Sequence, residues 1–265
     1  MNTSLKKERL PFFPLNIAVL PSEKLELYIF EERYAELVHQ CEENDHGFGI
    51  IPILGEKLLP YGTEVEVLKV KRSLKGGTSR ITVCGKRIFQ LFSFETRMDG
   101  LHLYSGGDVV FRNDKLTASS VASDRNEIIA NSVHKVDPQL NNDVKWDDFD
   151  EAQATSVERH SGLRLQKQVN VMFIEICDLI KKKGGFAYFD HEYFSLANKS
   201  LLGSPLKING KLDDSYAIAA QMGNFNLRER ARLIAMDKEE YRLKFIYKRM
   251  KTLLTALKNV TGKTS

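Results

Sequence analysis

Cysteine is scarce in this 265-residue sequence, which has three. Cys41, Cys84 and Cys177 are odd in number and far apart, so they form neither a disulfide framework nor a pair with metal-ligand spacing. Reduced thiols that are mostly buried are the usual state of such cysteines in a cytosolic protein. We therefore expect three free thiols.

Long hydrophobic runs are also missing. No segment approaches the ~18 consecutive apolar residues of a membrane span. The apolar run that follows Lys6, Lys7 and Arg9 is interrupted by Pro14 and Asn16 and has no small-residue cleavage site, so it does not fit a signal peptide. These absences predict a cytoplasmic protein that has no membrane partner.

Motifs of catalysis are absent as well. Residues 262–264 match the end of a phosphate-binding loop, but Leu257 stands where the loop needs its first glycine. The sequence contains neither the G-x-S-x-G nucleophile elbow nor H-E-x-x-H. His39, Cys41 and His46 are close in sequence, but their spacing fits no zinc pattern. We predict no enzymatic activity, no catalytic residue, no metal and no cofactor.

Charge is distributed unevenly along the chain. Residues 1–112 carry no net charge, residues 113–154 carry −5 and residues 155–265 carry +9. The middle segment has few large apolar residues, so it buries too little surface to offset the entropy of ordering it. The sequence predicts a β domain at 1–112, a polar acidic linker or insertion at 113–154, and a helical bundle at 155–265.

The first part of the chain has the patterns of β-strands. An apolar run at residues 10–20 is followed by a turn at 21–23 and then by strict alternation through Leu25, Leu27 and Ile29. From Phe30 the period becomes helical. Further short strands are predicted at 48–54, 63–73, 80–83, 87–94, 101–104 and 109–111, with Gly85 separating two of them. Five or six short strands and one helix predict a small barrel or a strongly bent sheet.

Helical periodicity dominates after residue 163. Helices are predicted at 163–180, 216–222, 227–236 and 237–257. Asn226 with Glu229, and Asp237 with Glu240, have the three-residue spacing of a capping box at the start of the last two helices.

Three groups of residues resemble the N-terminal substrate-recognition domain of Lon proteases, which also occurs as a freestanding protein. The first is L-P-x-F-P-L, V-L-P and L-x-L-x-I-F-E-x-R-Y within residues 10–34; the second is Gly62 followed by V-x-G-x-R at 83–87; the third is S-Y-x-x-A-x-x-M-G at 215–223 and L-R-E-R at 227–230. Ser22 departs from the family, which usually has glycine there. The motif residues, expected to be structural, are Pro11, Phe13, Pro14, Leu15, Phe30, Glu31, Arg33, Tyr34, Gly62, Gly85 and Arg87.

The resemblance implies an α+β fold in which a PUA-like β-barrel precedes a helical bundle. It also implies a freestanding protein without the ATPase and peptidase domains of Lon. Such a protein would recognise exposed apolar segments of other proteins, as an adaptor to a protease or a chaperone. Because one apolar patch binds weakly, formation of a homo-oligomer is an expected way to gain avidity.

A second hypothesis is an RNA-associated module, since PUA-like barrels elsewhere bind RNA. Its binding residues would be the basic side chains of the last helix: Arg242, Lys244, Lys248, Arg249 and Lys251. They could attract phosphates. The alternative is that they form the solvated face of an amphipathic helix. The solvated face is favoured over RNA binding, because no aromatic residues are interleaved with the basic ones.

Overall fold

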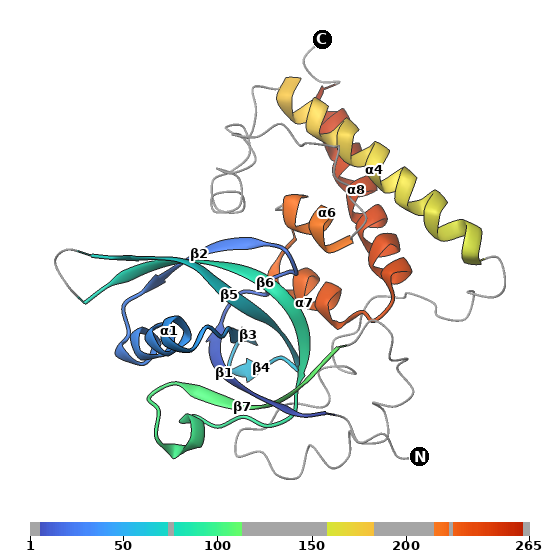
Figure 1. Cartoon of the computed structure of the whole chain (residues 1–265). Helices are drawn as coiled ribbons and strands as arrows, with labels where there is room; N and C mark the ends of the chain where they lie inside the picture. The colour runs from blue at the N-terminus through green and yellow to red at the C-terminus, as the bar shows by residue number, and fades with distance from the viewer. Residues whose placement is uncertain (1–5, 74–76, 113–157, 183–214, 223–224, 262–265) are drawn as a thin grey trace, which may run out of the picture. The chain divides into compact units, whose positions relative to one another are not determined.

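The computed structural model describes residues 6–73, 77–112, 158–182, 215–222 and 225–261 (Figure 1). The chain forms two compact units: Met1–Lys145 with Phe225–Ala235, and Trp146–Asn224 with Met236–Ser265. All described strands belong to the first unit, and the second contains helices, so the fold is α+β as predicted. The acidic segment predicted at 113–154 lies outside the described residues, and the domain boundaries drawn around it stay a prediction.

Five strands of the first unit close into a barrel. They are β1 (Glu8–Leu15), β3 (Phe48–Leu54), β5 (Tyr61–Arg72), β6 (Ser79–Leu91) and β7 (Ser105–Phe111). β1 pairs with β7, β7 with β6, β6 with β5 and β5 with β3, all antiparallel. The parallel pairing of β3 with β1 completes the ring. Two further strands extend it: β2 (Lys24–Ile29) pairs with β6, and β4 (Lys57–Leu58) pairs with β3.

Strand β1 carries large apolar side chains on both of its faces. Phe12 is fully buried in the cluster that contains Leu10 and Phe89, with its ring stacked 5.9 Å from that of Phe89. Phe13 points to the opposite face and belongs to a second cluster, which includes Tyr34. A strand that is buried on both faces needs a continuous apolar run and not an alternation. This requirement explains the unbroken apolar stretch at the start of the chain.

Two prolines are tolerated in β1 because the strand changes partners along its length. Residues 8–12 pair with β7 and residues 12–15 pair with β3. Pro11 therefore lies where only β7 is a neighbour, and Pro14 lies where only β3 is. Each proline can direct its missing N–H to the unpaired side, as at the edge of a sheet.

Helix α1 (Glu32–Asn44) follows β2 as the change of period predicts. Its buried residues, Tyr34, Leu37, Val38 and Cys41, recur at helical spacing and belong to the same cluster as Phe13. Glu32 in the first turn faces the positive end of the helix dipole. Asp45 ends the helix in the left-handed region.

Strand β6 is continuous from Ser79 to Leu91, so the predicted break at Gly85 is wrong. A Cβ atom at Gly85 would lie 2.2 Å from the carbonyl oxygen of Leu20. The glycine is thus needed for close approach of the chain that precedes β2, and not for a turn. The strand predicted at 101–104 is wrong: β7 begins at Ser105, after the short 3-10 helix η1 (Met98–Gly100), and includes the strand predicted at 109–111.

Helix α7 (Leu227–Ala235) belongs to the first unit, with the barrel. The predicted capping box is confirmed: Asn226 N–H donates to Glu229, and Glu229 N–H donates to the Asn226 side chain, both at 2.9 Å. At the other end, the Arg112 guanidinium donates to the carbonyls of Ile234 and Ala235, also at 2.9 Å. A cation there complements the negative end of the helix dipole.

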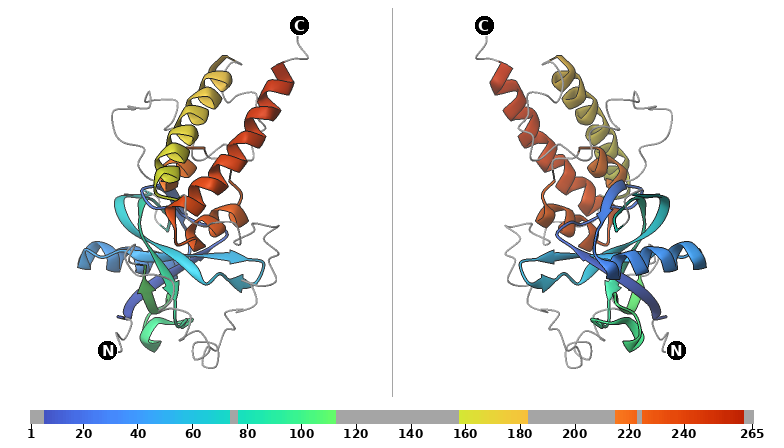
Figure 2. Two further views of the ribbon diagram at one scale, coloured as in Figure 1. Left: turned by 90° about the vertical axis from the view of Figure 1, so that its right-hand side faces the viewer. Right: turned by 90° about the vertical axis from the view of Figure 1, so that its left-hand side faces the viewer.

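The second unit contains α4 (Glu158–Lys182), α6 (Ser215–Met222) and α8 (Glu239–Thr261). Helices α4 and α8 lie side by side, as both views of Figure 2 show, and the Lys258 ammonium pairs with Glu175 at 2.7 Å. None of the described helices has both the length and the apolar character needed to cross a membrane.

Candidate functional site

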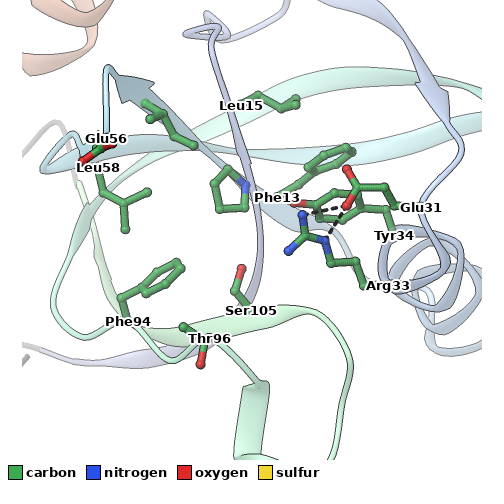
Figure 3. A pocket seen from close by; sticks show the side chains of 12 residues that line it. Phe13, Leu15, Glu31, Arg33, Tyr34, Glu56, Leu58, Phe94, Thr96 and Ser105 are labelled. Carbon is green, nitrogen blue, oxygen red and sulfur yellow. Dashed lines mark hydrogen bonds and ion pairs between the residues drawn. The ribbon is translucent and has the colours of Figure 1, made fainter. Parts of the chain in front are cut away.

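Six of the residues that carry the family resemblance meet at one pocket of the first unit. Its volume is about 510 Å³. The lining residues are Phe13, Pro14, Leu15, Glu31, Arg33, Tyr34, Ile53, Glu56, Leu58, Phe94, Thr96 and Ser105. In Figure 3, Leu58 and Phe94 lie on one side of the opening, and Glu31, Arg33 and Tyr34 lie on the other. We call this pocket the motif pocket.

Two stacked rings form a rigid wall of the motif pocket. Phe13 from β1 and Tyr34 from α1 are both buried, and their ring centroids are 3.7 Å apart. Burial raises the pKa of the Tyr34 hydroxyl above its usual value, so the ring stays neutral at physiological pH. Because the strand and the helix pack in one core, the rings are fixed before any ligand arrives. The wall is therefore preorganised to receive an apolar or aromatic group.

A charged pair forms the polar margin beside these rings. The Arg33 guanidinium donates to the Glu31 carboxylate at 2.8 Å through Nε and approaches it to 2.6 Å through Nη2. Its central carbon lies 4.7 Å from the centroid of the Tyr34 ring. Because the side chains of Arg33 and Glu31 are 51% and 38% exposed, the pair remains in contact with solvent. It can therefore exchange partners with a polar group of a ligand.

Half-buried apolar side chains form the opposite margin. Pro14 and Leu15 come from β1, Ile53 and Leu58 come from the β3–β4 hairpin, and Phe94 follows β6. Ile53 and Leu58 are direct partners across the hairpin. Apolar surface that is only partly buried gains free energy when a ligand covers it, at roughly 25 cal/mol per Å². The pocket is thus suited to hold an apolar side chain from another molecule.

A buried serine hydroxyl lies in the motif pocket. The Ser105 hydroxyl is buried and donates to the Phe12 carbonyl at 3.2 Å. No histidine, cysteine or lysine is among the residues that line the pocket. Within the described part of the chain, no group of three or more His, Cys, Asp and Glu side chains could hold a metal ion.

The other family-motif residues lie outside the motif pocket. A Cβ atom at Gly62 would lie 2.4 Å from the Phe89 ring, so glycine lets that ring pack against the strand. The Arg87 guanidinium donates to the Glu64 carboxylate at 2.6 Å through Nε and at 3.0 Å through Nη2. Phe30 is 66% exposed. Pro11 and Gly85 have the strand roles described above.

The basic residues predicted on the last helix do not share one environment. Arg242 is buried, and its guanidinium donates to Ser215 at 3.0 Å and to the Met236 carbonyl at 2.8 Å. Glu239 accepts from Arg242 and also from the backbone N–H and hydroxyl of Ser215, which ties α6 to α8. Arg242 is therefore turned inward and is not presented to an external phosphate.

The remaining four basic residues lie nearer to solvent. Lys244 pairs with Glu240 at 2.7 Å, one turn away. Arg249 is half-buried, and Lys248 and Lys251 are exposed. This distribution is typical of the solvated face of an amphipathic helix. Binding of nucleic acid by these residues stays a prediction.

Three apolar residues of the motif pocket were missed by sequence reasoning. Ile53 and Leu58 belong to the β3–β4 hairpin and Phe94 follows β6, and no motif marks them. A signal was present at the hairpin: the apolar run ending at Leu54 resumes at Leu58 after Gly55, which is a pattern of two short paired strands. Phe94 gives no such signal, because only the tertiary fold brings it to the pocket.

The family model of the ATP-dependent protease La (LON) substrate-binding domain matches residues 9–252. A solved structure of the N-terminal domain of the Lon protease of Mycobacterium avium complex is 13% identical, over 92% of this chain and 98% of that one, with a TM-score of 0.51. At that identity the likeness concerns the fold.

A crystal structure of a Lon N-terminal domain protein from Xanthomonas campestris shares 30% identity with this chain. The match covers 40% of this chain, and the chain spans 60% of that protein, with a TM-score of 0.36. A search of curated proteins found no match.

Proposed function

The chain belongs to the LON substrate-binding domain family, as its motifs predicted, and from this membership we propose that it binds exposed apolar segments of other proteins in the motif pocket. A substrate-binding domain of Lon is non-catalytic. We propose the same for this protein as a whole, with the further role of an adaptor that delivers its clients to a protease or a chaperone.

One observation carries the proposal. Phe13, Pro14, Leu15, Glu31, Arg33 and Tyr34 were singled out only because they match the family pattern, and all six line one half-apolar pocket. The motif residues of β1 and of the start of α1 thus meet at one opening to solvent. Their convergence fits a surface that binds a ligand.

The size of the pocket limits the affinity of a single site. Covering ~300 Å² of apolar surface contributes roughly 7 kcal/mol, and association costs at least about 4 kcal/mol. The balance of about −3 kcal/mol corresponds to millimolar binding or weaker. A client protein is therefore bound tightly only if several of its apolar segments bind several copies of this protein, or if a partner protein binds it at the same time.

Binding of a short fluorescent peptide with two leucines and a phenylalanine tests the proposal. Fluorescence anisotropy would compare wild type with the double variant Leu15→Ser, Ile53→Ser. The matched control is Leu103→Ser, which truncates a 41% exposed leucine that does not line the pocket. We expect weak binding that persists in high salt, because burial of apolar surface releases no counterions, and that is lost only in the double variant. Equal binding by all three proteins would refute the proposal.

A further inference from the structure

Strand β2 has a free edge on the side away from β6. Residues 24–29 pair with residues 79–84 of β6, and no other described strand pairs with β2. Gly85 donates its N–H to the Glu23 carbonyl at 2.9 Å. With this register, the backbone groups of the odd-numbered residues of β2 face β6. Because the backbone groups of an antiparallel strand alternate between its two sides, those of Lys24, Glu26 and Tyr28 point to the free edge.

Two aromatic side chains stand exposed at the end of this edge. Tyr28 is 57% exposed and Phe30 is 66% exposed, and their ring centroids are 6.4 Å apart. Neither residue lines the motif pocket. Large exposed aromatic side chains that lie together on a strand edge are a usual feature of a protein interface.

Basic side chains dominate the sheet face that Tyr28 shares. The pairing register places Tyr28 beside Arg80 and Lys71, and it places Glu26 in line with Lys69. Arg80, Lys69 and Lys71 are all exposed. The Arg80 guanidinium is 4.0 Å from Glu26, which leaves the two lysines of this face to attract an external anion.

We propose that an extended, acidic segment of a partner protein adds to the free edge of β2 as a further strand. The unpaired N–H and C=O groups of alternate residues recognise a polypeptide backbone, which a nucleic acid lacks. The basic face selects acidic side chains.

Peptide binding and amide hydrogen exchange together test this proposal on the full-length protein. The probe is a fluorescent eight-residue peptide in which valine and glutamate alternate, and the matched peptide has lysine in place of glutamate. We expect the glutamate peptide to bind about tenfold more tightly than the lysine peptide, because the positive potential of this sheet face attracts glutamate and repels lysine. Its binding should weaken as salt is raised.

The position of the added strand is read from the amide protons of the protein. Exchange at Lys24, Glu26 and Tyr28 should slow when the glutamate peptide binds, while Leu25 and Leu27, already bonded to β6, should change little. Unchanged exchange at the three outward amides would overturn the proposal, as would preferential binding of a single-stranded RNA in place of the peptide.

Variants separate this surface from the motif pocket. Glu26→Pro removes one outward donor and leaves the β6 ladder intact, so it should abolish binding of the glutamate peptide, whereas Glu26→Gln should retain it. Tyr28→Ser with Phe30→Ser should weaken binding about tenfold without altering the backbone. All of these variants should bind the apolar peptide normally, and Leu15→Ser, Ile53→Ser should bind the glutamate peptide normally. Retention of glutamate-peptide binding by both Glu26→Pro and the Tyr28/Phe30 variant would overturn the proposal.

Discussion

The guanidinium of Arg230 on α7 pairs with the carboxylate of Glu23, which precedes β2 by one residue, and both side chains are buried. Arg230 Nε also donates to the Ala18 carbonyl at 2.7 Å, while Glu23 accepts the Leu20 N–H at 2.9 Å. The two residues are 207 positions apart in sequence. This pair fixes the turn between β1 and β2 to a helix from the far end of the chain.

Replacing Arg230 by Met is predicted to destabilise the first unit by about 3–5 kcal/mol, because the Glu23 carboxylate stays buried without its cation. Urea unfolding followed by circular dichroism, with amide exchange of α7 as a local probe, measures the effect. Arg228→Met is the control, since Arg228 is exposed on the same helix. Equal stability of the two variants would show that the buried pair contributes nothing.

Gly85→Ala is predicted to destabilise the barrel by more than 2 kcal/mol, since the added methyl meets the backbone of Leu20, which cannot move aside easily. Gly55→Ala serves as the comparison: its φ is +65°, but a Cβ there meets nothing within 4 Å. That variant should cost only about 1–2 kcal/mol, the usual penalty for a left-handed residue. Thermal melts measure the stability of both variants. A Gly55→Ala variant that is less stable than Gly85→Ala would contradict the role given to Gly85.

Alkylation of the thiols should depend on burial. Burial raises the pKa of the Cys41 thiol to about 12, so almost none of it is the nucleophilic thiolate at pH 8. Iodoacetamide followed by mass spectrometry should label half-buried Cys84 at least tenfold faster than Cys41. Because the unfolded thiol ionises first, the contribution of Cys41 to stability should be complete below about pH 8.5 and decline toward pH 12. Similar labelling rates for both thiols in the native protein would contradict this.

Substitution of Lys244, Lys248 and Lys251 by Gln should leave binding of the apolar peptide unchanged. The three lysines belong to the helical unit, and none lines the motif pocket. Anisotropy with fluorescent peptide and with fluorescent RNA at two salt concentrations measures both activities. RNA binding that falls steeply with salt and is lost in the variant, with no peptide binding by either protein, would favour the RNA-associated module.

Local patterns were enough to predict most elements of the fold. The apolar run of β1, the alternation of β2 and the helical period of α1 each depend on neighbours in sequence, and the capping box at Asn226 and Glu229 does too. The continuity of β6 through Gly85 was not predictable, because the need for glycine arises from Leu20, which is distant in sequence. Ser22, where the family usually has glycine, adopts a φ of 64°, so the left-handed turn persists without it.

Six residues of the candidate site belong to the family motif, but the sequence marked them as structural and not as a site. The rest of the site depends on tertiary contacts between β1, the β3–β4 hairpin and the segment after β6. Arg242 is a residue that the sequence predicted in an external binding site and that tertiary contacts bury instead. Its spacing on α8 placed it on a basic face, but the carboxylate of Glu239 and the hydroxyl of Ser215 hold it inside the second unit.

Intermolecular nuclear Overhauser effects between an apolar peptide and isotope-labelled protein test the location of the binding site most directly. With unlabelled peptide and methyl-labelled protein, the ring protons of the peptide phenylalanine should show contacts to the methyl groups of Leu15, Ile53 and Leu58, which line the motif pocket. The methyl groups of Leu103 should show none. Contacts confined to methyl groups outside the pocket, or no contacts at millimolar peptide, would contradict the assignment of this pocket as the substrate-binding site.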